Sequence, residues 1–404
     1  MDSRECFIPA LRFTGFEDCW KEYRLGDFSQ SIKRVVSDTQ VHIMMITAQN
    51  GFINQSDRYS FNNAGESLKK YIELHKGELA YNHGASKLRP FGSCFSLQID
   101  KARIPFVYHC FSIKENDPEF ISLVLNNKNT EGQLRKIVTS GARMDGLLNI
   151  SFEQYCSLNL KIPSLKEQYV IADFFKSLDS MITLTSKKIE KLKQALTGCM
   201  QTMFPLEGEL EPKIRFKEFK GKWGENKALN IFSPINEKNR PDLPVLSANQ
   251  NVRGMAPRSE TGYQISHDKR NEVGYKHVLP GQFVMHLRSF QGGFAHASLE
   301  GITSPAYTVF GLKDTSAHYD MYWKYVFMSE EFVHRLITIT YGIRDGRSIS
   351  FDEFTKMNFI FPSYDEQKKI ADYITTFYEV VALQTKRLDL LKHIKSACLD
   401  NMFI

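Results

Sequence analysis

The sequence has 404 residues, 42% of them hydrophobic and 24% charged, with a formal net charge of +6. This length predicts two or three domains, and the composition is that of a folded chain, which excludes a disordered one. No run of 18 apolar residues is present, and residues 1–6 contain no apolar stretch. We therefore expect neither a membrane-spanning nor a secreted protein, but a cytoplasmic one. The mild positive charge permits a polyanionic partner without requiring one.

The cysteines give a second constraint. There are seven, and none lies in a Cys-x-x-Cys pair. An odd number without paired spacing argues against a disulfide framework and against a structural zinc site, and it favours a reducing compartment.

The first element in chain order is an entry segment, residues 9–22, with the sequence PALRFTGFEDCWKE. Residues 212–225, PKIRFKEFKGKWGE, repeat its Pro, Arg, Phe, Phe, Trp and Glu at an offset of 203. An internal repeat in the sequence indicates a repeated structural unit, so this match predicts a chain made of two copies of one unit.

A variable body follows each entry segment, over residues 26–160 and 231–358. Residues 41–46 and 283–287 have the pattern of short buried strands, and residues 119–125 and 322–328 that of buried helices. Each body is therefore predicted to be an α/β or α+β domain. Shorter repeats link the bodies: residues 47–50 with 247–251, 77–81 with 281–285, and Gly-x-Arg at 141–143 with 342–344.

The loops of both bodies carry basic and amide side chains among aromatic residues. Arginine suits bidentate contact with guanine, asparagine and glutamine suit adenine, and lysine meets phosphate. The Gly-x-Arg pair is the stronger candidate because it recurs in both copies. The candidate DNA contacts are Asn82, Lys87, Arg89, Arg143, Asn249, Gln250, Arg253, Arg288, Gln291, Arg344 and Arg347.

A closing segment ends each copy, residues 163–204 and 362–403, and the two align without a gap with fourteen of 42 positions identical. Apolar residues recur at a and d heptad positions, which predicts two long helices that pair antiparallel as a coiled coil, relating the halves by a pseudo-two-fold axis. Thr185 and Gln384 share one polar d position, and Lys395 breaks the second seam. The predicted seam residues are Ile171, Phe175, Leu178, Ile182, Ile189, Leu192, Leu196, Ile370, Ile374, Phe377, Val381, Leu388 and Leu391.

No catalytic motif matches the sequence well. Ser304-Pro-Ala-Tyr307 lacks the second proline of an adenine methyltransferase motif, and no Glu-x-Lys follows Pro241-Asp242 at nuclease spacing. Glu366-Gln-Lys368 lies in the repeat, where Tyr169 replaces the lysine. No Walker loop or His-Glu-x-x-His is present. We therefore expect no enzyme and no bound metal.

The closing motif, Pro-x-x-x-Glu-Gln-x-x-Ile-Ala-x-[Phe/Tyr], resembles the conserved regions of type I restriction–modification specificity subunits. It stands at Pro163, Glu167, Gln168, Ile171, Ala172 and Phe174, and again at Pro362, Glu366, Gln367, Ile370, Ala371 and Tyr373. The entry motif, Pro9 to Trp20 and Pro212 to Trp223, is similar to that family too. The doubled layout matches over essentially the whole chain.

This resemblance implies two target recognition domains, each recognising one half of a split, asymmetric DNA site. The domains would be residues 1–160, helix 161–208, residues 209–358 and helix 359–404. The helices would set the gap between half-sites and dock two methyltransferase subunits, and through them the restriction/translocase subunits. S-adenosylmethionine, ATP and Mg²⁺ would bind only those partners. Because Tyr378 replaces Asp179 and Lys395 breaks the seam, docking at that end is expected to be weaker or rearranged.

Two alternatives share the doubled layout. A specificity subunit could serve a fused nuclease–methyltransferase, or the chain could be a two-headed protein-binding scaffold without DNA contact. Salt-sensitive binding of duplex DNA would separate the scaffold from both specificity subunits.

Overall fold

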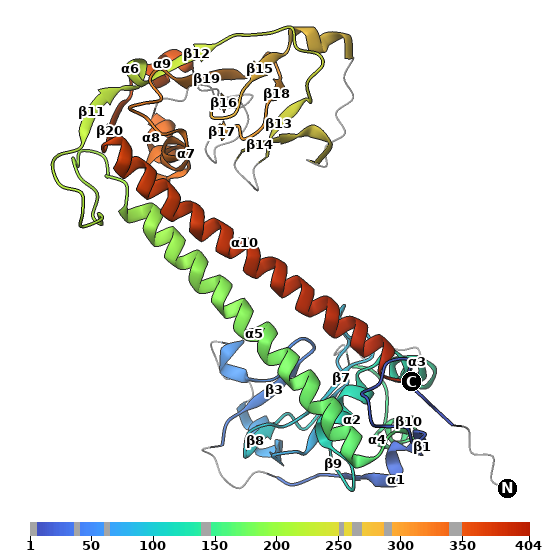
Figure 1. Ribbon diagram of the computed structural model, residues 1–404. Helices are drawn as coiled ribbons and strands as arrows, with labels where there is room; N and C mark the ends of the chain where they lie inside the picture. Colours follow the sequence, from blue (N-terminus) through green and yellow to red (C-terminus); the bar gives the residue numbers. More distant parts are fainter. Residues whose placement is uncertain are drawn as a thin grey trace. The chain divides into compact units, whose positions relative to one another are not determined.

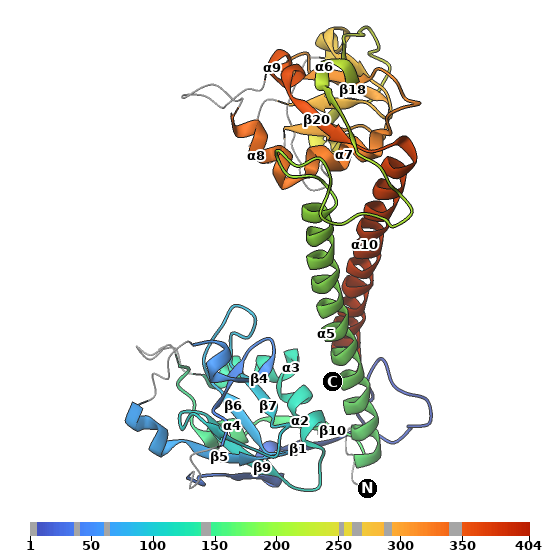
Figure 2. The ribbon, with the colours of Figure 1, turned by 90° about the vertical axis from the view of Figure 1, so that its left-hand side faces the viewer.

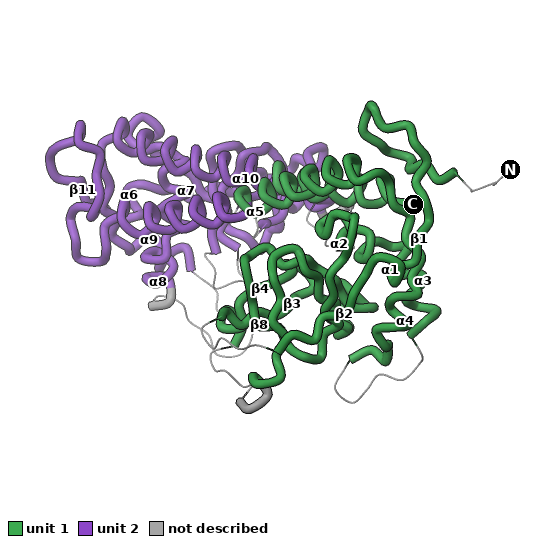
Figure 3. Tube along the Cα trace, turned by 90° about the horizontal axis from the view of Figure 1, so that it is seen from below, with its two compact units in different colours: residues 1–185, 387–404 green, residues 186–386 purple. Residues whose placement is uncertain are grey.

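The computed structural model describes residues 6–35, 41–59, 65–138, 147–249, 254–260, 269–286, 293–338 and 350–404. The chain forms two compact units (Figure 3). Unit 1 comprises residues 1–185 and 387–404, and unit 2 comprises residues 186–386. Each unit therefore contains one body together with parts of both long helices.

Unit 1 runs from the entry segment into the first long helix, and it also includes the end of the second long helix (Figure 1). Its elements are β1 (Lys21–Arg24), α1 (Leu25–Phe28), β2 (Ser29–Ser31), β3 (Met44–Thr47), β4 (Gly51–Asn54), β5 (Ile72–His75), β6 (Leu79–Asn82), β7 (Ser93–Ser96), β8 (Lys101–Ile104), β9 (His109–Ile113), α2 (Pro118–Leu125), α3 (Lys128–Ile137), α4 (Phe152–Cys156), β10 (Asn159–Ile162) and the start of α5 (Leu165–Thr202).

Unit 2 repeats these elements one for one. They are β11 (Gly224–Lys227), α6 (Ala228–Ile231), β12 (Phe232–Ile235), β13 (Leu246–Asn249), β14 (Gly254–Pro257), β15 (Lys276–Val278), β16 (Phe283–Met285), β17 (Phe294–His296), β18 (Gly301–Thr303), β19 (Thr308–Leu312), α7 (Asp320–Met328), α8 (Glu330–Thr338), α9 (Phe351–Lys356), β20 (Asn358–Phe361) and the start of α10 (Tyr364–Asn401). Two short 3₁₀ turns precede β5, and two precede β15. The repeat predicted from the sequence is confirmed.

The sheets follow the same plan in both units. Unit 1 has a four-stranded sheet of order β2-β9-β6-β7, and β3 pairs with β4 in a separate hairpin. In unit 2 the corresponding strands form one six-stranded sheet, β12-β19-β16-β17-β14-β13, because a parallel bridge between Gly254 and His296 joins β14 to β17. The last body strand returns to the entry strand in each unit, as β1–β10 and β11–β20.

Aromatic and aliphatic side chains fill the core of each body. In unit 1, Phe120 of α2 packs with Trp20 of the entry segment, their ring centroids 5.9 Å apart. In unit 2, Trp323 of α7 packs against Phe232, at 5.1 Å. The buried helices expected at residues 119–125 and 322–328 are therefore α2 and α7. The first predicted strand begins later than expected, at Met44, although Val41 is also buried.

The long helices pair within each unit. In unit 1, Phe175 of α5 shares a core with Leu391 and Phe403 from the end of α10, with the Phe175 and Phe403 rings 5.9 Å apart. In unit 2, Leu196 near the end of α5 shares a core with Ile374 near the start of α10. The start of each helix thus packs on the end of the other, so the pairing is antiparallel, as predicted (Figure 2). Every predicted seam residue is buried or half-buried.

Lys395 does not leave a polar defect in the seam of unit 1. Its side chain is half-buried, and its Nζ contacts Asp179 Oδ1 on α5. The repeat equivalents of this pair are Leu196 and Tyr378 in unit 2. Lys395 and Tyr378, the two departures of the second copy, therefore occupy positions at which the two units carry different side chains on equivalent turns of the helices.

Two further observations concern the expectations from composition. Cys6 and Cys19 are joined by a disulfide, so the prediction that cysteines remain unpaired is wrong for these two. They flank the antiparallel bridge between Phe7 and Trp20, which brings them together, and this tertiary contact has no signature in their spacing. No helix in the described ranges is long and apolar enough to cross a membrane.

Candidate nucleic-acid interface

The motif residues that repeat in both halves are bound inside the chain. Arg12 of the entry segment donates from Nε and Nη2 to the two carboxylate oxygens of Glu167, at 2.8 and 2.7 Å. Glu167 is buried, and its carboxylate raises the pKa of the Arg12 guanidinium through this bond. Arg215 and Glu366 repeat the arrangement at 2.7 and 2.8 Å. Both pairs tie an entry segment to the first turn of the helix that closes the same copy.

The glutamine of each motif holds the body against the same turn. Gln168 Oε1 accepts the backbone N–H of Asp117 at 2.9 Å, just before α2, and its Nε2 donates to the Pro163 carbonyl at 3.1 Å. Gln367 accepts from Tyr319 N at 2.9 Å, just before α7, and donates to the Pro362 carbonyl, also at 2.9 Å. The motif is therefore a structural joint between body and helix, and recognition must lie elsewhere.

The best candidate in unit 1 is the sheet edge where the β3–β4 and β6–β7 hairpins turn. Asn82, at the end of β6, donates from Nδ2 to the Ile46 carbonyl of β3 at 3.1 Å. Its Oδ1 accepts the Gly84 N–H at 2.9 Å. Gly84 in turn bridges to Leu147, which directly follows residues 139–146. Asn82 thus holds neighbouring loops together, which is an internal role.

His83 reinforces this junction. Its side chain is buried, with Nδ1 2.9 Å from the Leu148 carbonyl oxygen and Nε2 2.7 Å from that of Val107. Its ring stacks on His109 with centroids 5.0 Å apart. Burial lowers the pKa of His109. The ends of two loops that carry predicted contacts are therefore fixed to each other on one side of the body.

The two basic candidates on the β6–β7 loop have different environments. Arg89 is half-buried and donates from Nη1 to the Asn126 carbonyl, and burial lowers the pKa of its guanidinium. Lys87 is exposed at the tip of the turn that Ser86 closes on Arg89, with the Ser86 N–H 3.0 Å from the Arg89 carbonyl oxygen. Lys87 is free to meet a ligand, whereas Arg89 shapes the loop.

Unit 2 presents the matching edge. Because β14 runs parallel to β17, the β13–β14 and β16–β17 hairpins turn on the same side of the sheet. The described ends of these strands include Asn249, which has an interaction partner within the chain. His286, next to β16, donates its backbone N–H to the Gly293 carbonyl at 2.8 Å, and burial lowers the pKa of its imidazole.

The seven remaining predicted contacts all lie outside the described residues, and they stay predictions. These are Arg143, Gln250, Arg253, Arg288, Gln291, Arg344 and Arg347.

Two exposed amide residues at this edge are not among the predicted contacts. Gln49 and Asn50 form the exposed turn between β3 and β4, beside the loop that carries Lys87. The signal available in the sequence was the repeat of residues 47–50 at 247–251, which marks the same turn in both halves.

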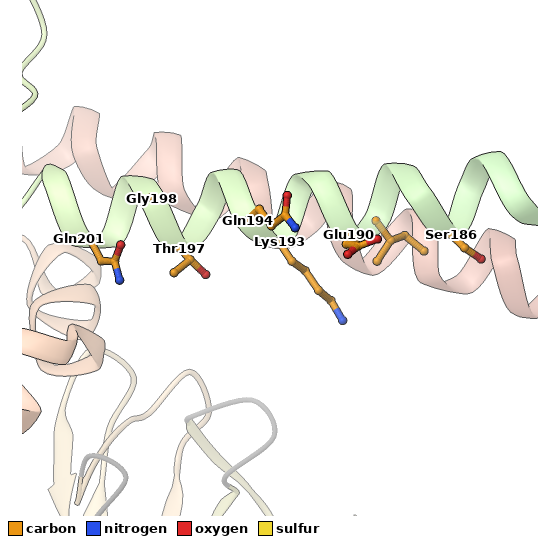
Figure 4. Close-up of a pocket in the computed structure, with 8 residues that line it drawn as sticks. Ser186, Glu190, Lys193, Gln194, Thr197, Gly198 and Gln201 are labelled. Carbon is orange, nitrogen blue, oxygen red and sulfur yellow. The ribbon is translucent and has the colours of Figure 1, made fainter. Parts of the chain in front are cut away.

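The helices carry two further surface features. In unit 2 a shallow hollow runs along α5 (Figure 4), lined by Ser186, Ile189, Glu190, Lys193, Gln194, Thr197, Gly198 and Gln201. Its lining includes one acidic side chain, Glu190, and one basic side chain, Lys193, but no histidine or cysteine. Over the described ranges, no group of three metal-ligating side chains occurs.

The second feature is a line of exposed apolar residues on both helices of unit 1. An α-helix turns by roughly 100° per residue. By this measure, about a quarter turn separates the seam from Val170, Met181 and Leu184 on α5, and from Leu390 and Ile394 on α10. The offset has the same sense in both antiparallel helices, so these side chains share one face of the pair. We call this set the apolar side face. Leu184 is 66% exposed, and its repeat equivalent in unit 2, Leu383, is 65% exposed.

Comparison with known proteins defines the class of the first half. The model of the type I restriction modification DNA specificity domain matches residues 17–194 of this chain. This confirms the resemblance that the motifs indicated.

Particular proteins are similar to this chain in sequence or in fold. The chain is 28% identical over 195 residues to the type I restriction enzyme HindI specificity subunit of Haemophilus influenzae, covering 46% of this chain. The match spans 40% of that relative's length. In fold, the chain is similar to the S subunit of a type I restriction–modification system from M. genitalium, with a TM-score of 0.58, 13% identity and coverage of 98% and 99% of the two chains. The HsdS subunit of Thermoanaerobacter tengcongensis gives a TM-score of 0.47 at 14% identity, over 95% and 96% of the chains.

Proposed function

We propose that this chain is the specificity subunit of a type I restriction–modification complex, which selects the DNA site and performs no chemistry itself. The observation that carries the proposal is the one-for-one repetition of elements in two units, in a chain whose residues 17–194 match the model of the DNA specificity domain. Each unit brings hairpin turns to one edge of its body, which supplies one recognition surface per unit.

The two surfaces differ in sequence, so the site they select is split and asymmetric. Unit 1 presents Gln49, Asn50 and Lys87 at its edge, whereas the matching stretch of unit 2 has the different sequence Ser247-Ala-Asn-Gln-Asn251. Different side chains in the same scaffold select different bases, because base edges in the major groove differ in their donors and acceptors. Each unit would therefore recognise one half of the site.

The helices would separate the half-sites by a fixed gap. Each of α5 and α10 has 38 residues, about 57 Å at 1.5 Å per residue. The functional domains would then be the recognition bodies, residues 1–160 and 209–358, and the helices, residues 161–208 and 359–404.

The apolar side face is the proposed docking site for methyltransferase subunits. An exposed apolar stripe on a helix is the usual contact of an amphipathic partner. Leu184 and its equivalent Leu383 offer matching positions for two copies of one partner. Restriction/translocase subunits would join through the methyltransferases, and S-adenosylmethionine, ATP and Mg²⁺ would bind those partners.

A map of methylated adenines tests the proposal. The chain and a candidate methyltransferase are expressed together in a strain without adenine methylation, and modified bases are mapped by single-molecule sequencing. A split motif with a fixed unspecified gap, absent when either protein is omitted, is the expected result. No methylation with both proteins folded and associated would overturn it and favour a scaffold. The same motif from a single fused nuclease–methyltransferase would identify that partner instead.

A further inference from the structure

We propose that the β3–β4 turn of unit 1 is a base-recognition element, in which Gln49 and Asn50 contact adenine in the major groove while Lys87 contacts the adjacent phosphate. This inference rests on the proposed function and names the residues through which unit 1 would select its half-site.

The chemistry of the turn fits this role. Gln49 and Asn50 are both exposed, and neither side chain has a hydrogen-bond partner among the residues that the structure describes. A side-chain amide offers one donor and one acceptor to the N7 and N6 edge of adenine. A two-stranded β-ribbon is narrow enough to enter the major groove. The free amides therefore lie where a hairpin presents side chains to a duplex.

The turn is fixed in place, which a recognition element needs. Thr47 Oγ1 accepts the Asn50 N–H at 3.2 Å and lies 3.3 Å from the Gly51 carbonyl oxygen, to which it donates. Gly51 has a φ of 64°, and a Cβ there would meet the Phe95 ring of β7 at 3.1 Å. Glycine lets the hairpin lie directly on β7, so the tip is held before any ligand arrives.

The neighbouring loop supplies a cation on the same side. The bond from Asn82 to the Ile46 carbonyl joins the end of β6 to β3, so the β6–β7 loop leaves the body beside the β3–β4 turn (Figure 2). Lys87 is exposed at its tip and has no ion-pair partner in the described part of the chain. At a DNA interface, some side chains contact phosphate and position the protein, while others contact bases and determine specificity. A lysine next to two amides fits this pattern.

The test uses the complex with its methyltransferase. Gln49→Ala and Asn50→Ala should each weaken binding of the cognate duplex by about 5- to 150-fold, the range for losing one good base contact, and the double variant should weaken it further. Asn50→Asp keeps the size of the side chain but removes its donors, and it should give a similar loss. The methylated motif should become degenerate at one or two positions of one half, with the other half unchanged. Lys87→Ala should weaken binding to all sequences and reduce the salt slope by about one.

Gln30→Ala is the matched control, since Gln30 is an exposed amide on β2, at the opposite edge of the same sheet from β7. It should leave both motif and affinity unchanged. An unaltered motif in the Gln49 and Asn50 variants, or equal degeneracy in both halves, would overturn the inference while the wild-type split motif still supported the proposed function. A wild-type complex that yields no split motif would instead remove the proposed function, and this inference with it.

Discussion

Arg12 and Glu167 lie 155 residues apart in sequence and form a bidentate ion pair, and Arg215 and Glu366 form the same pair at a separation of 151. The glutamate is 1% exposed in both cases. A buried carboxylate that loses its partner retains its full desolvation cost, so these pairs are sensitive points of the fold.

Arg12→Met should lower the free energy of unfolding of unit 1 by about 3–5 kcal/mol, because Glu167 would remain buried and unpaired. Urea unfolding measures the change. Lys176→Met, which breaks an exposed pair with Glu119, is the control and should cost less than about 1 kcal/mol. Equal effects of the two variants would show that the Arg12 pair has no special structural role.

Arg143→Ala and Arg344→Ala test the repeated Gly-x-Arg segments. Because the segments belong to different halves, each variant should alter the specified bases of one half-site and leave the other intact. Methylome mapping of the two complexes measures this. Loss at both halves together, or an unchanged motif, would contradict the assignment.

Leu184→Glu tests the apolar side face. At 66% exposure this leucine adds little to folding, so stability should stay within about 0.5 kcal/mol of wild type. A charge in an apolar contact should nevertheless displace one methyltransferase copy, and Leu383→Glu should displace the other. The mass of the purified complex reports both losses. Leu299→Glu, an exposed leucine outside the helices, is the control. A complex that keeps both methyltransferase copies in the Leu184→Glu variant would show that the docking site is not on this face.

Removal of one heptad from each helix, residues 182–188 and 381–387, tests the spacer role. The deletion keeps the seam in register and shortens each helix by about 10.5 Å. The gap in the methylated motif should shrink by about three base pairs, or methylation should be abolished. A gap of wild-type length would show that the helices do not set it.

The stability of the chain should fall as the pH drops from about 6.5 toward the lowered pKa values of three histidines. Burial lowers the pKa of His109, His286 and His318 below the usual value near 6.5. In this window the unfolded chain binds more protons than the folded one, so the free energy of unfolding rises with pH and is lost on acidification. The His318 ring packs between Trp323 and Phe361. His318→Leu should therefore reduce the loss of stability on acidification. Urea titrations at pH 5 and pH 7 measure it, and an unchanged difference would exclude His318 as a contributor.

Periodicity and repetition were sufficient to predict the doubled fold and the seam, because a buried helix face imposes its period on the sequence. The partners of loop side chains were not predictable. Asn82 and Arg89 have the chemistry of DNA contacts, yet the fold directs them to the carbonyls of Ile46 and Asn126. Gln49 and Asn50 have the same chemistry, and only their position on a hairpin turn distinguishes them. The partner of Glu167 was equally hidden, since its ion pair joins segments far apart in sequence.

The inclusion of residues 387–404 in unit 1 has a consequence for how the protein is made. Ile171, Phe175 and Leu178 leave the ribosome long before Leu391, Met402 and Phe403, with which they form one core. Synthesis of residues 186–386 in between takes roughly 10–40 s at about 5–20 residues per second. For that interval the face of α5 that packs on residues 387–404 stays uncovered, and such exposed apolar surface favours aggregation of a nascent chain.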